Sequence, residues 1–549
     1  MKIPSKVSNF IKDNLLTNDV YNLWMMILKT HVKYYSKLNN KEDFSFHKDF
    51  STVDYLEFDV LEGMSLAEIS MVYEYTLALN DKAHKKITGS YYTPEDIAVF
   101  MAKHYSIFEK DKVWLDPCSG VGNLSYYLAL VQDNPEDFVL NNLILQDINE
   151  LALKIAHTLF ALYFSNTIEN YYDKIAKNFI VKDFLKDYVK PDQNNSVNVE
   201  NSLFDEILFN EKENKIQQNS KSKKYDYVIV NPPYLSKTKN DNFITVECSD
   251  LYAYFLEKIA FESEGFISIT PQSFTNGKKF QVLRNILINE INDLSIYSCD
   301  NMPDSIFKSY KYESSNTNTK NSVRASIIVA QKSDTEQRNH KITFLMRWTS
   351  SQRQDAIDKF DEQLVNTVFE IDEIFPKLYS GTENFYNEIK DNDTIESLLS
   401  KTETKYWLIV PSTPRYYISA SKTDLSRSSF HKLFFNDEES MNLAYVLINS
   451  SYMYWWWRVV SDGMSLSKDN LTSLPLIKDL DMSDEKFVNL VEKLENSEKS
   501  NKVVKLNAGK ENENIKHPFE LVSLVNKEIV VDSILINNIV RSHRNSIVD

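Results

Sequence analysis

The chain has 549 residues, enough for about two to four domains with a substantial core. It is 42% hydrophobic and 26% charged, as in soluble globular proteins, and no window approaches the roughly 18 consecutive apolar residues of a membrane span. The N-terminus has no apolar stretch of the secretion-signal type. Three widely separated cysteines fit a reducing compartment better than a disulfide framework or a zinc site. We therefore expect a cytoplasmic protein with no membrane span and no metal centre.

The net charge of −16 argues at first against a nucleic-acid partner, because phosphate contacts need Lys and Arg. The distribution of charge is a sharper test than its sum. Basic clusters interrupt the acidic background at residues 85–86, 221–224, 237–239, 278–279 and 308–324. Each cluster alone is typical of a solvated surface, but their presence keeps nucleic-acid binding open.

The N-terminal segment, residues 1–85, is expected to be helical, since apolar positions recur at three- and four-residue spacing in 20–32 and 66–79. Residues 86–335 alternate short apolar runs with helix-like stretches, which is typical of an α/β domain with a mostly parallel sheet. A polar insertion is expected at 191–224. The expected strands are residues 112–115, 143–146, 179–181, 225–230, 266–270, 294–298 and 325–330.

The remaining residues, 336–549, are expected to form a separate α+β domain that ends in helices. Its expected strands are residues 341–348, 406–410 and 416–420, with a helix at 441–448. The aromatic run at 452–457 is more typical of a buried core than of a surface that reads bases.

The first motif with chemical content is Thr-Gly-Ser-Tyr-Tyr-Thr-Pro-Glu at residues 88–95. A capped helix start explains the threonine and the proline. The glycine and the paired tyrosines exceed what a cap needs, and exposed backbone groups there could contact a ligand carboxylate.

The second motif, Asp-Pro-Cys-Ser-Gly-Val-Gly-Asn at residues 116–123, lies between an apolar strand and a helix-like stretch. Glycines at such a turn let the backbone approach a ligand, and the helix N-terminus offers unpaired N–H groups. Asp147 ends the next strand, where its carboxylate could accept hydrogen bonds from both hydroxyls of a ribose. A strand-end Asp is often only a helix cap, but the combination predicts a nucleotide-like pocket. Asp183, a third strand-end acid, could touch an adenine edge.

The most informative motif is Asn231-Pro232-Pro233-Tyr234, which follows the apolar run at 227–230. Its prolines remove two backbone donors and stiffen the loop. The side-chain carbonyl of Asn231 and the carbonyl of Pro232 could accept both hydrogens of one planar amino group. Tyr234 offers a flat face for stacking a ring. A strand-terminating Pro-Pro turn is the alternative without chemistry.

In this order the motifs resemble the gamma group of N6-adenine DNA methyltransferases, over residues 86–332 and more loosely beyond. The resemblance implies a Rossmann-like α/β S-adenosylmethionine-dependent domain and a C-terminal target-recognition domain. It also implies sequence-specific methyl transfer to N6 of a flipped adenine in double-stranded DNA, in a restriction-modification or related system. The family turn more often reads Cys-Gly-Ser-Gly, whereas Ser119 precedes Gly120 here.

The resemblance also assigns residues. The catalytic loop would be Asn231, Pro232, Pro233 and Tyr234. Binding of S-adenosylmethionine would fall to Gly89, Tyr91, Tyr92, Thr93, Asp116, Cys118, Gly120, Gly122, Asn123, Asp147, Ile148, Asp183 and Phe184. Candidate DNA contacts are Lys237, Lys278, Lys279, Arg415 and Arg427. A cognate restriction endonuclease is a further candidate partner, and the chain is expected to be a monomer or dimer.

Three alternatives stay open. The chain could be the modification subunit of a multisubunit restriction system that leaves recognition to another chain, although residues 333–549 favour recognition within this one. Protein-glutamine and RNA N-methyltransferases also use Asn-Pro-Pro-Tyr, but they are usually smaller. A DNA-binding protein with an inactive cofactor pocket is the non-enzymatic alternative. A fused nuclease is not expected, because residues 1–85 are too few to house one.

Overall fold

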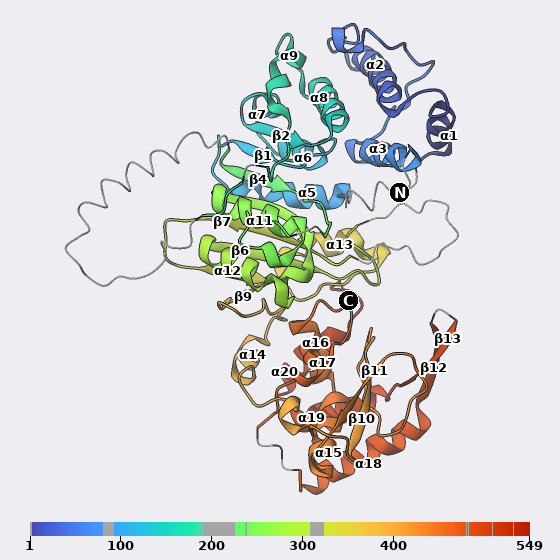
Figure 1. Cartoon of the computed structure of the whole chain (residues 1–549), viewed down its shortest axis with the longest axis vertical. Coiled ribbons are helices and arrows are strands. Elements are labelled where there is room, and N and C mark those ends of the chain that lie inside the picture. The colour runs from blue at the N-terminus through green and yellow to red at the C-terminus, as the bar shows by residue number, and fades with distance from the viewer. Residues whose placement is uncertain are drawn as a thin grey trace, which may run out of the picture.

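The structure is a computed structural model. It describes residues 3–80, 93–186, 188–191, 225–236, 239–307, 323–478, 480, 482–507, 509–530 and 532–548. The chain runs from N-terminal helices, through a central sheet flanked by helices, to a C-terminal region at the opposite end of the molecule (Figure 1). None of the described helices is both long and apolar enough to cross a membrane. Gly89, Tyr91, Tyr92, Lys237 and all but the first residue of the expected insertion at 191–224 lie outside the described residues.

The N-terminal segment contains three helices, α1 (Ser5–Asn14), α2 (Val20–Asn39) and α3 (Leu66–Asn80), and residues 40–65 between α2 and α3 are mostly loop. Helix α2 begins where the Asp19 carboxylate caps the N–H of Asn22 at 2.8 Å. A capping box starts α3: Glu68 N–H donates to Ser65 Oγ at 3.3 Å, and Ser65 N–H donates to Glu68 Oε2 at 3.0 Å. These helices pack on the helices that cover the sheet.

The sheet has nine strands in the order β3-β2-β1-β4-β5-β7-β6-β8-β9. The strands are β1 (Trp114–Asp116), β2 (Leu143–Asp147), β3 (Phe179–Val181), β4 (Tyr227–Val230), β5 (Gly265–Pro271), β6 (Asp293–Cys299), β7 (Ala325–Gln331), β8 (Asn339–Ile342) and β9 (Val365–Thr367). Neighbours from β3 to β5 are parallel, and β7 is antiparallel to both β5 and β6. All seven strands expected before residue 336 are present, and the α/β prediction is confirmed.

Helices cover both faces of the sheet, and this explains why its strands are continuous apolar runs. In β4, Tyr227 and Ile229 join the core cluster that holds Ile97 of α5, whereas Val228 and Val230 join the cluster that holds Leu256 of α11. The helices around the sheet are α5 (Glu95–Lys103), α6 (Asn123–Leu130), α7 (Pro135–Asn141), α8 (Glu150–Phe164), α9 (Tyr171–Ile175), α11 (Leu251–Glu262), α12 (Gln281–Glu290) and α13 (Arg353–Asp358).

The sheet extends past the boundary expected at residue 335. Strand β8 pairs in parallel with β6, and β9 pairs with β8, so the strand expected at 341–348 belongs to the central sheet and not to a separate one. Ile342 is fully buried in the same core cluster as Ile296 of β6. The strand expected at 416–420 is also absent: these described residues form a loop. Periodicity marks an extended segment but does not identify its partner strand.

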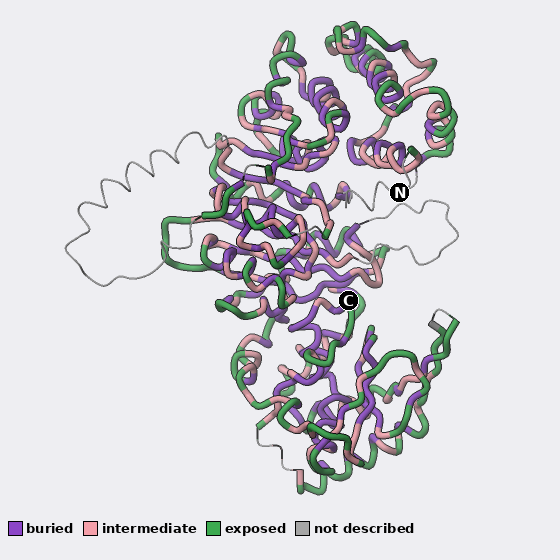
Figure 2. Tube along the Cα trace, in the orientation of Figure 1, coloured by how far each residue is buried: buried purple, intermediate pink, exposed green. Residues whose placement is uncertain are grey.

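The C-terminal region combines helices with two hairpins, β10 with β11 and β12 with β13. Its elements are α14 (Glu383–Ile389), β10 (Trp407–Pro411), β11 (Phe430–Phe434), α15 (Glu438–Ile448), α16 (Ser451–Val460), α17 (Lys468–Thr472), α18 (Glu485–Ser500), β12 (Lys502–Asn507), β13 (Lys510–Ile515), α19 (Phe519–Ile529) and α20 (Ser533–Val540). Every residue of α16 is buried, which confirms that the aromatic run is core. The β12–β13 hairpin projects from the region and is largely exposed (Figures 1 and 2).

Candidate functional site

Three polar side chains predicted from the sequence lie at one edge of the sheet. Asp116 ends β1, Asp147 ends β2, and Asn231 follows β4. Strand β1 pairs in parallel with both of the other strands, so their carboxyl ends meet at this edge. Ligands of open α/β sheets bind at this position.

The glycine turn after β1 is held against the neighbouring strand. Gly120 and Gly122 both have left-handed φ values, +54° and +86°. Gly120 N–H donates to Asp147 Oδ2 at 2.8 Å. A Cβ at residue 122 would lie 2.7 Å from the Phe160 ring, so glycine is required there on both grounds. Ser119 is the position at which this turn departs from the usual Cys-Gly-Ser-Gly sequence. Its backbone N–H still donates to Gln146 O of β2, at 2.9 Å.

Asp116 is 1% exposed beneath this turn. Its Oδ2 accepts from Ser125 Oγ at 2.9 Å, while Oδ1 is buried with no hydrogen-bond partner among the described residues. Burial raises its pKa to about 7, against the opposing effect of the Ser125 hydrogen bond. Burial also raises the pKa of Asp147, although three backbone N–H donors lower it. The turn therefore concentrates acceptors that favour a ligand with donors or positive charge.

Asp116→Asn is expected to remove a pH-dependent loss of stability. The pKa of Asp116 is about 7 in the folded chain and 3.8 in the unfolded chain. Its contribution to stability is therefore fully present below pH 3.8 and is lost as the pH rises through about 7, because the unfolded chain releases this proton first. Because Asn stays neutral, the unfolding temperature of the variant should gain on that of the native chain between about pH 4 and about pH 7, and the gain should level off above about pH 7, where Asp116 is ionised in both states. Thermal unfolding at constant ionic strength measures this difference, and a difference independent of pH would contradict the assignment.

Thr93 joins the Asn231 loop to the glycine turn. Asn231 Nδ2 donates to Thr93 Oγ1 at 2.9 Å, and Asn123 Nδ2 donates to Thr93 O at 2.9 Å. With Nδ2 engaged in this way, the amide of Asn231 has a fixed orientation and presents Oδ1 as its acceptor. The thiol of Cys118 donates to Asn231 O at 3.2 Å, and burial raises the pKa of this thiol.

The rest of the Asn231 loop is also anchored. Pro232 is buried and Pro233 is half-buried. The Tyr234 hydroxyl donates to Ile269 O of β5 at 3.0 Å, and its ring lies edge-on to Phe307 with centroids 5.8 Å apart. Stacking of a ligand ring on Tyr234 stays a prediction.

The other predicted cofactor residues differ in exposure. Ile148, next to Asp147, is 72% exposed, which suits contact with a flat ring. Asp183 is exposed and accepts from Leu185 N at 3.0 Å. Phe184 is 5% exposed and stacks on Phe255 with centroids 5.3 Å apart, so most of its surface serves packing.

Gln272 is a candidate site residue that the sequence did not reveal. It follows β5, the strand next to β4, and is 1% exposed. Its Oε1 and Nε2 both lack a hydrogen-bond partner among the described residues. Its position directly after a strand, as for Asp116 and Asn231, is the signal that could have identified it.

Asp300 forms a buried charge cluster between the sheet and the C-terminal region. It follows β6 and accepts from Arg324 Nε at 2.8 Å, Arg347 Nε at 2.8 Å and Arg458 Nη1 at 2.5 Å. The three guanidinium groups hold the pKa of Asp300 well below its usual range. Arg347 Nη2 also donates to Arg415 O at 3.0 Å, so the cluster holds a loop of the C-terminal region.

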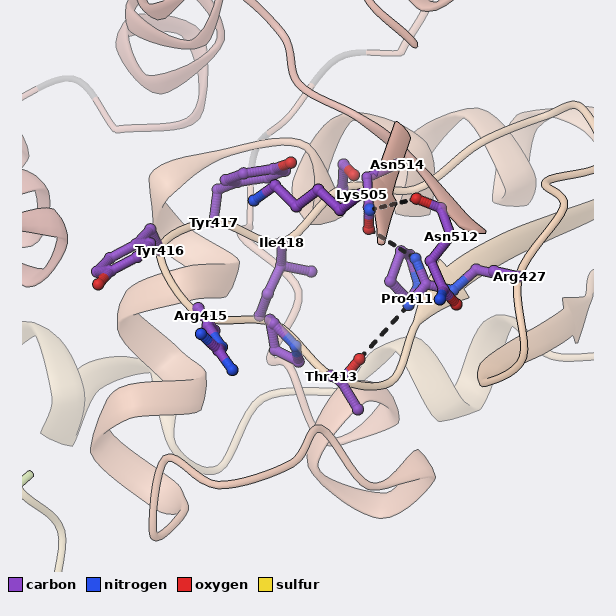
Figure 3. Close-up of a pocket in the computed structure, with 12 residues that line it drawn as sticks. Pro411, Thr413, Arg415, Tyr416, Tyr417, Ile418, Arg427, Lys505, Asn512 and Asn514 are labelled. Carbon is purple, nitrogen blue, oxygen red and sulfur yellow. Dashed lines mark hydrogen bonds between the residues drawn. The ribbon is translucent and has the colours of Figure 1, made fainter. Parts of the chain in front are cut away.

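The predicted DNA contacts do not form one group. Lys278 pairs with Asp469 at 2.6 Å and Lys279 pairs with Asp250 at 2.5 Å, both at the surface. Arg415 and Arg427 instead line one polar pocket of the C-terminal region, between the 411–419 loop and the β12–β13 hairpin (Figure 3). Their contact with DNA stays a prediction.

The strand order and the glycine turn define the class of the protein, a Rossmann-like α/β domain of the S-adenosylmethionine-dependent methyltransferase type. Residues 141–307 match the family model of the Eco57I restriction-modification methylases. This segment is therefore similar to the restriction-modification methylases, in agreement with the resemblance seen in the sequence motifs.

Several solved structures resemble the chain at low scores. The DrdV–DNA complex is 14% identical, with a TM-score of 0.43 over 67% of this chain and 44% of that one. A modification subunit of a putative type I restriction enzyme from Vibrio vulnificus YJ016 is 11% identical, with a TM-score of 0.40 over 67% of this chain and 92% of that one. The type IIL enzyme MmeI in complex with DNA is 12% identical, with a TM-score of 0.40 over 99% and 89%.

The chain spans less than half the length of the DrdV chain. No curated protein matches the sequence.

Proposed function

We propose that this chain is a DNA methyltransferase that transfers a methyl group from S-adenosylmethionine to N6 of an adenine flipped out of duplex DNA. The observation that carries the proposal is the fixed Asn231 amide, which Thr93 orients beside the glycine turn. An oriented carbonyl acceptor next to a nucleotide-type turn suits transfer to a planar amino group.

The glycine turn fits S-adenosylmethionine in chemical terms. The buried Oδ1 of Asp116 has no partner among the described residues, and the absent Cβ of Gly122 lets the turn pack closely against Phe160 and Leu145. Asp147 would bind the ribose hydroxyls, and Ile148 would contact the adenine ring. When bound, the cofactor supplies an electrophilic methyl group on a sulfonium.

The role of the Asn231 loop is placement. The target adenine must leave the duplex stack, at a cost of a few kcal/mol. Asn231 Oδ1 and Pro232 O would accept the two N6 hydrogens and hold them out of the ring plane, so that the nitrogen lone pair is localised for attack. The new N–CH3 bond replaces the S–CH3 bond, and the surplus N6 proton leaves to water. Placement of the two reactants accounts for catalysis without a side-chain general base.

The class of substrate is tested by methyl transfer from labelled S-adenosylmethionine to duplex DNA, RNA and a glutamine-containing protein fraction in parallel. Incorporation into duplex DNA by the chain alone is expected. Incorporation into protein or RNA only would support the alternative methyltransferase classes. Activity on DNA that requires a second chain would support the modification-subunit alternative.

Thr93→Val tests whether Thr93 positions Asn231. Loss of the hydroxyl acceptor frees the amide to rotate, so kcat is expected to fall by about tenfold to a hundredfold. Thr93→Ser keeps the hydroxyl and should restore kcat. Steady-state kinetics separate this role from a packing role, because both variants are close to Thr in size. Equal kcat values for the Val and Ser variants would contradict it.

A further inference from the structure

The polar pocket of the C-terminal region is lined on one side by the 411–419 loop and on the other by the β12–β13 hairpin (Figure 3). Its charged lining residues are Arg415, Arg427 and Lys505, and none of its lining residues is acidic. This is unusual in a chain with a net charge of −16. The pocket therefore suits a ligand with negative charge or exposed acceptors.

The register of the hairpin separates two chemically different faces. Lys505 pairs with Asn512 and Val503 pairs with Asn514, so these side chains share the pocket face. Val504 and Leu506 pair with Glu513 and Glu511, which places both hairpin acids on the opposite face. The pocket face of the hairpin therefore carries no acidic side chain, whereas the opposite face carries two.

Some of the lining residues are already engaged in hydrogen bonds that hold the pocket together. Arg427 Nη1 donates to Asn514 Oδ1 at 2.6 Å and to Glu513 O at 3.0 Å, and its Nε donates to Ser429 O at 2.7 Å. Asn512 Oδ1 accepts from Ser428 N at 3.1 Å. Arg427 is thus a positioning residue, and the amide oxygens of Asn512 and Asn514 are engaged.

The charged groups left for a ligand are donors. The side chains of Arg415 and Lys505 are exposed and have no ion pair among the described residues. The Lys505 ammonium lies 5.9 Å from the ring centroid of Tyr417, whose buried hydroxyl has no hydrogen-bond partner among the described residues. Guanine presents two acceptors, O6 and N7, on its major-groove edge, whereas adenine presents one acceptor and one donor. The pocket complements guanine.

We propose that this pocket reads a G·C pair of the target sequence from the major groove, with Lys505 and Arg415 as donors to guanine. A two-stranded ribbon such as the β12–β13 hairpin fits the major groove of B-form DNA. This inference rests on the proposed function for its choice of duplex DNA, and it assigns the recognition step to residues of this chain.

The test is selection of bound duplexes from a randomised DNA library by the full chain, followed by sequencing. The native chain should enrich a motif that contains a required G·C pair. Lys505→Ala and Arg415→Ala should each reduce the preference at that pair by about tenfold to a hundredfold while leaving the other positions of the motif unchanged. Lys505→Gln, which offers one donor and one acceptor, should move the preference toward A·T. Lys502→Ala, on the opposite face of the same strand, is the charge-matched control and should leave the motif unchanged.

Enrichment of no motif by the native chain would overturn the inference, as would an unchanged motif in both alanine variants. Uniform weakening across all sequences would also overturn it, because that is the behaviour of a phosphate contact. Selection is measured without methyl transfer. A chain that selects the motif but methylates no adenine would therefore contradict the proposed function and leave this inference standing.

Discussion

Asn231→Ala is expected to lower the rate of methyl transfer to DNA by about a hundredfold to a thousandfold, the effect of removing one positioned polar group from an active site. The side chain supplies one of the two proposed acceptors for the amino group, and Ala supplies none. Affinity for S-adenosylmethionine should change little, because the glycine turn and Asp147 are untouched. Single-turnover methylation and calorimetric titration of the cofactor measure the two effects separately.

Asn231→Asp is the matched variant. It keeps an acceptor oxygen at the same position but loses the Nδ2 donor to Thr93, so partial activity between that of the native chain and the Ala variant is expected. Native activity in the Ala variant would refute the role of Asn231. Loss of cofactor binding in the same variant would show that it acts on the fold of the site and not on the amino group.

Asp300→Asn is expected to be the most destabilising single substitution at the boundary of the sheet and the C-terminal region. Asp300 is 1% exposed and neutralises a cluster in which Arg458 is fully buried and Arg347 is 5% exposed. Removing one partner from a buried ionic cluster leaves uncompensated charge, which costs about 3 to 5 kcal/mol. The midpoint of urea unfolding, followed by tryptophan fluorescence, measures this cost.

The position of the cluster gives Asp300→Asn a second expected effect. Arg347 and the Tyr454 hydroxyl both donate to Arg415 O, at 3.0 and 2.6 Å. Weakening their support should loosen the loop that carries Arg415, so specific DNA binding should fall together with stability. Asp469→Asn, which breaks only the surface pair with Lys278, is the control for stability and should change the unfolding midpoint little. Equal unfolding midpoints for the two variants would contradict the importance of the cluster.

Much of the fold follows from local sequence. The seven central strands are recognisable because both faces of each strand are covered, which produces short unbroken apolar runs between helices. The strand-end positions of Asp116, Asp147 and Asn231 predict that they meet, since parallel strands end at a common edge. The motif at residues 231–234 could be interpreted from its residue types alone, because an amide acceptor, two prolines and an aromatic ring suit the binding of a planar amino group.

The contacts that complete the site could not be predicted, because they join residues distant in sequence. Thr93 and Asn231 are 138 positions apart, and Asp300 and Arg458 are 158 apart. No local pattern encodes such pairs. The continuation of the sheet into β8 was missed for a similar reason, since the sequence marks an extended segment at 341–348 but does not identify β6 as its partner strand. Strand β9 was not predicted.

The most direct test of the proposed function is identification of the methylated nucleoside. Duplex DNA lacking prior methylation, incubated with the chain and S-adenosylmethionine, would be digested to nucleosides and examined by mass spectrometry. The proposal predicts N6-methyldeoxyadenosine, absent from a parallel reaction with the Asn231→Ala variant. N4-methyldeoxycytidine as the product, or N6-methyldeoxyadenosine at the native level with the variant, would contradict it.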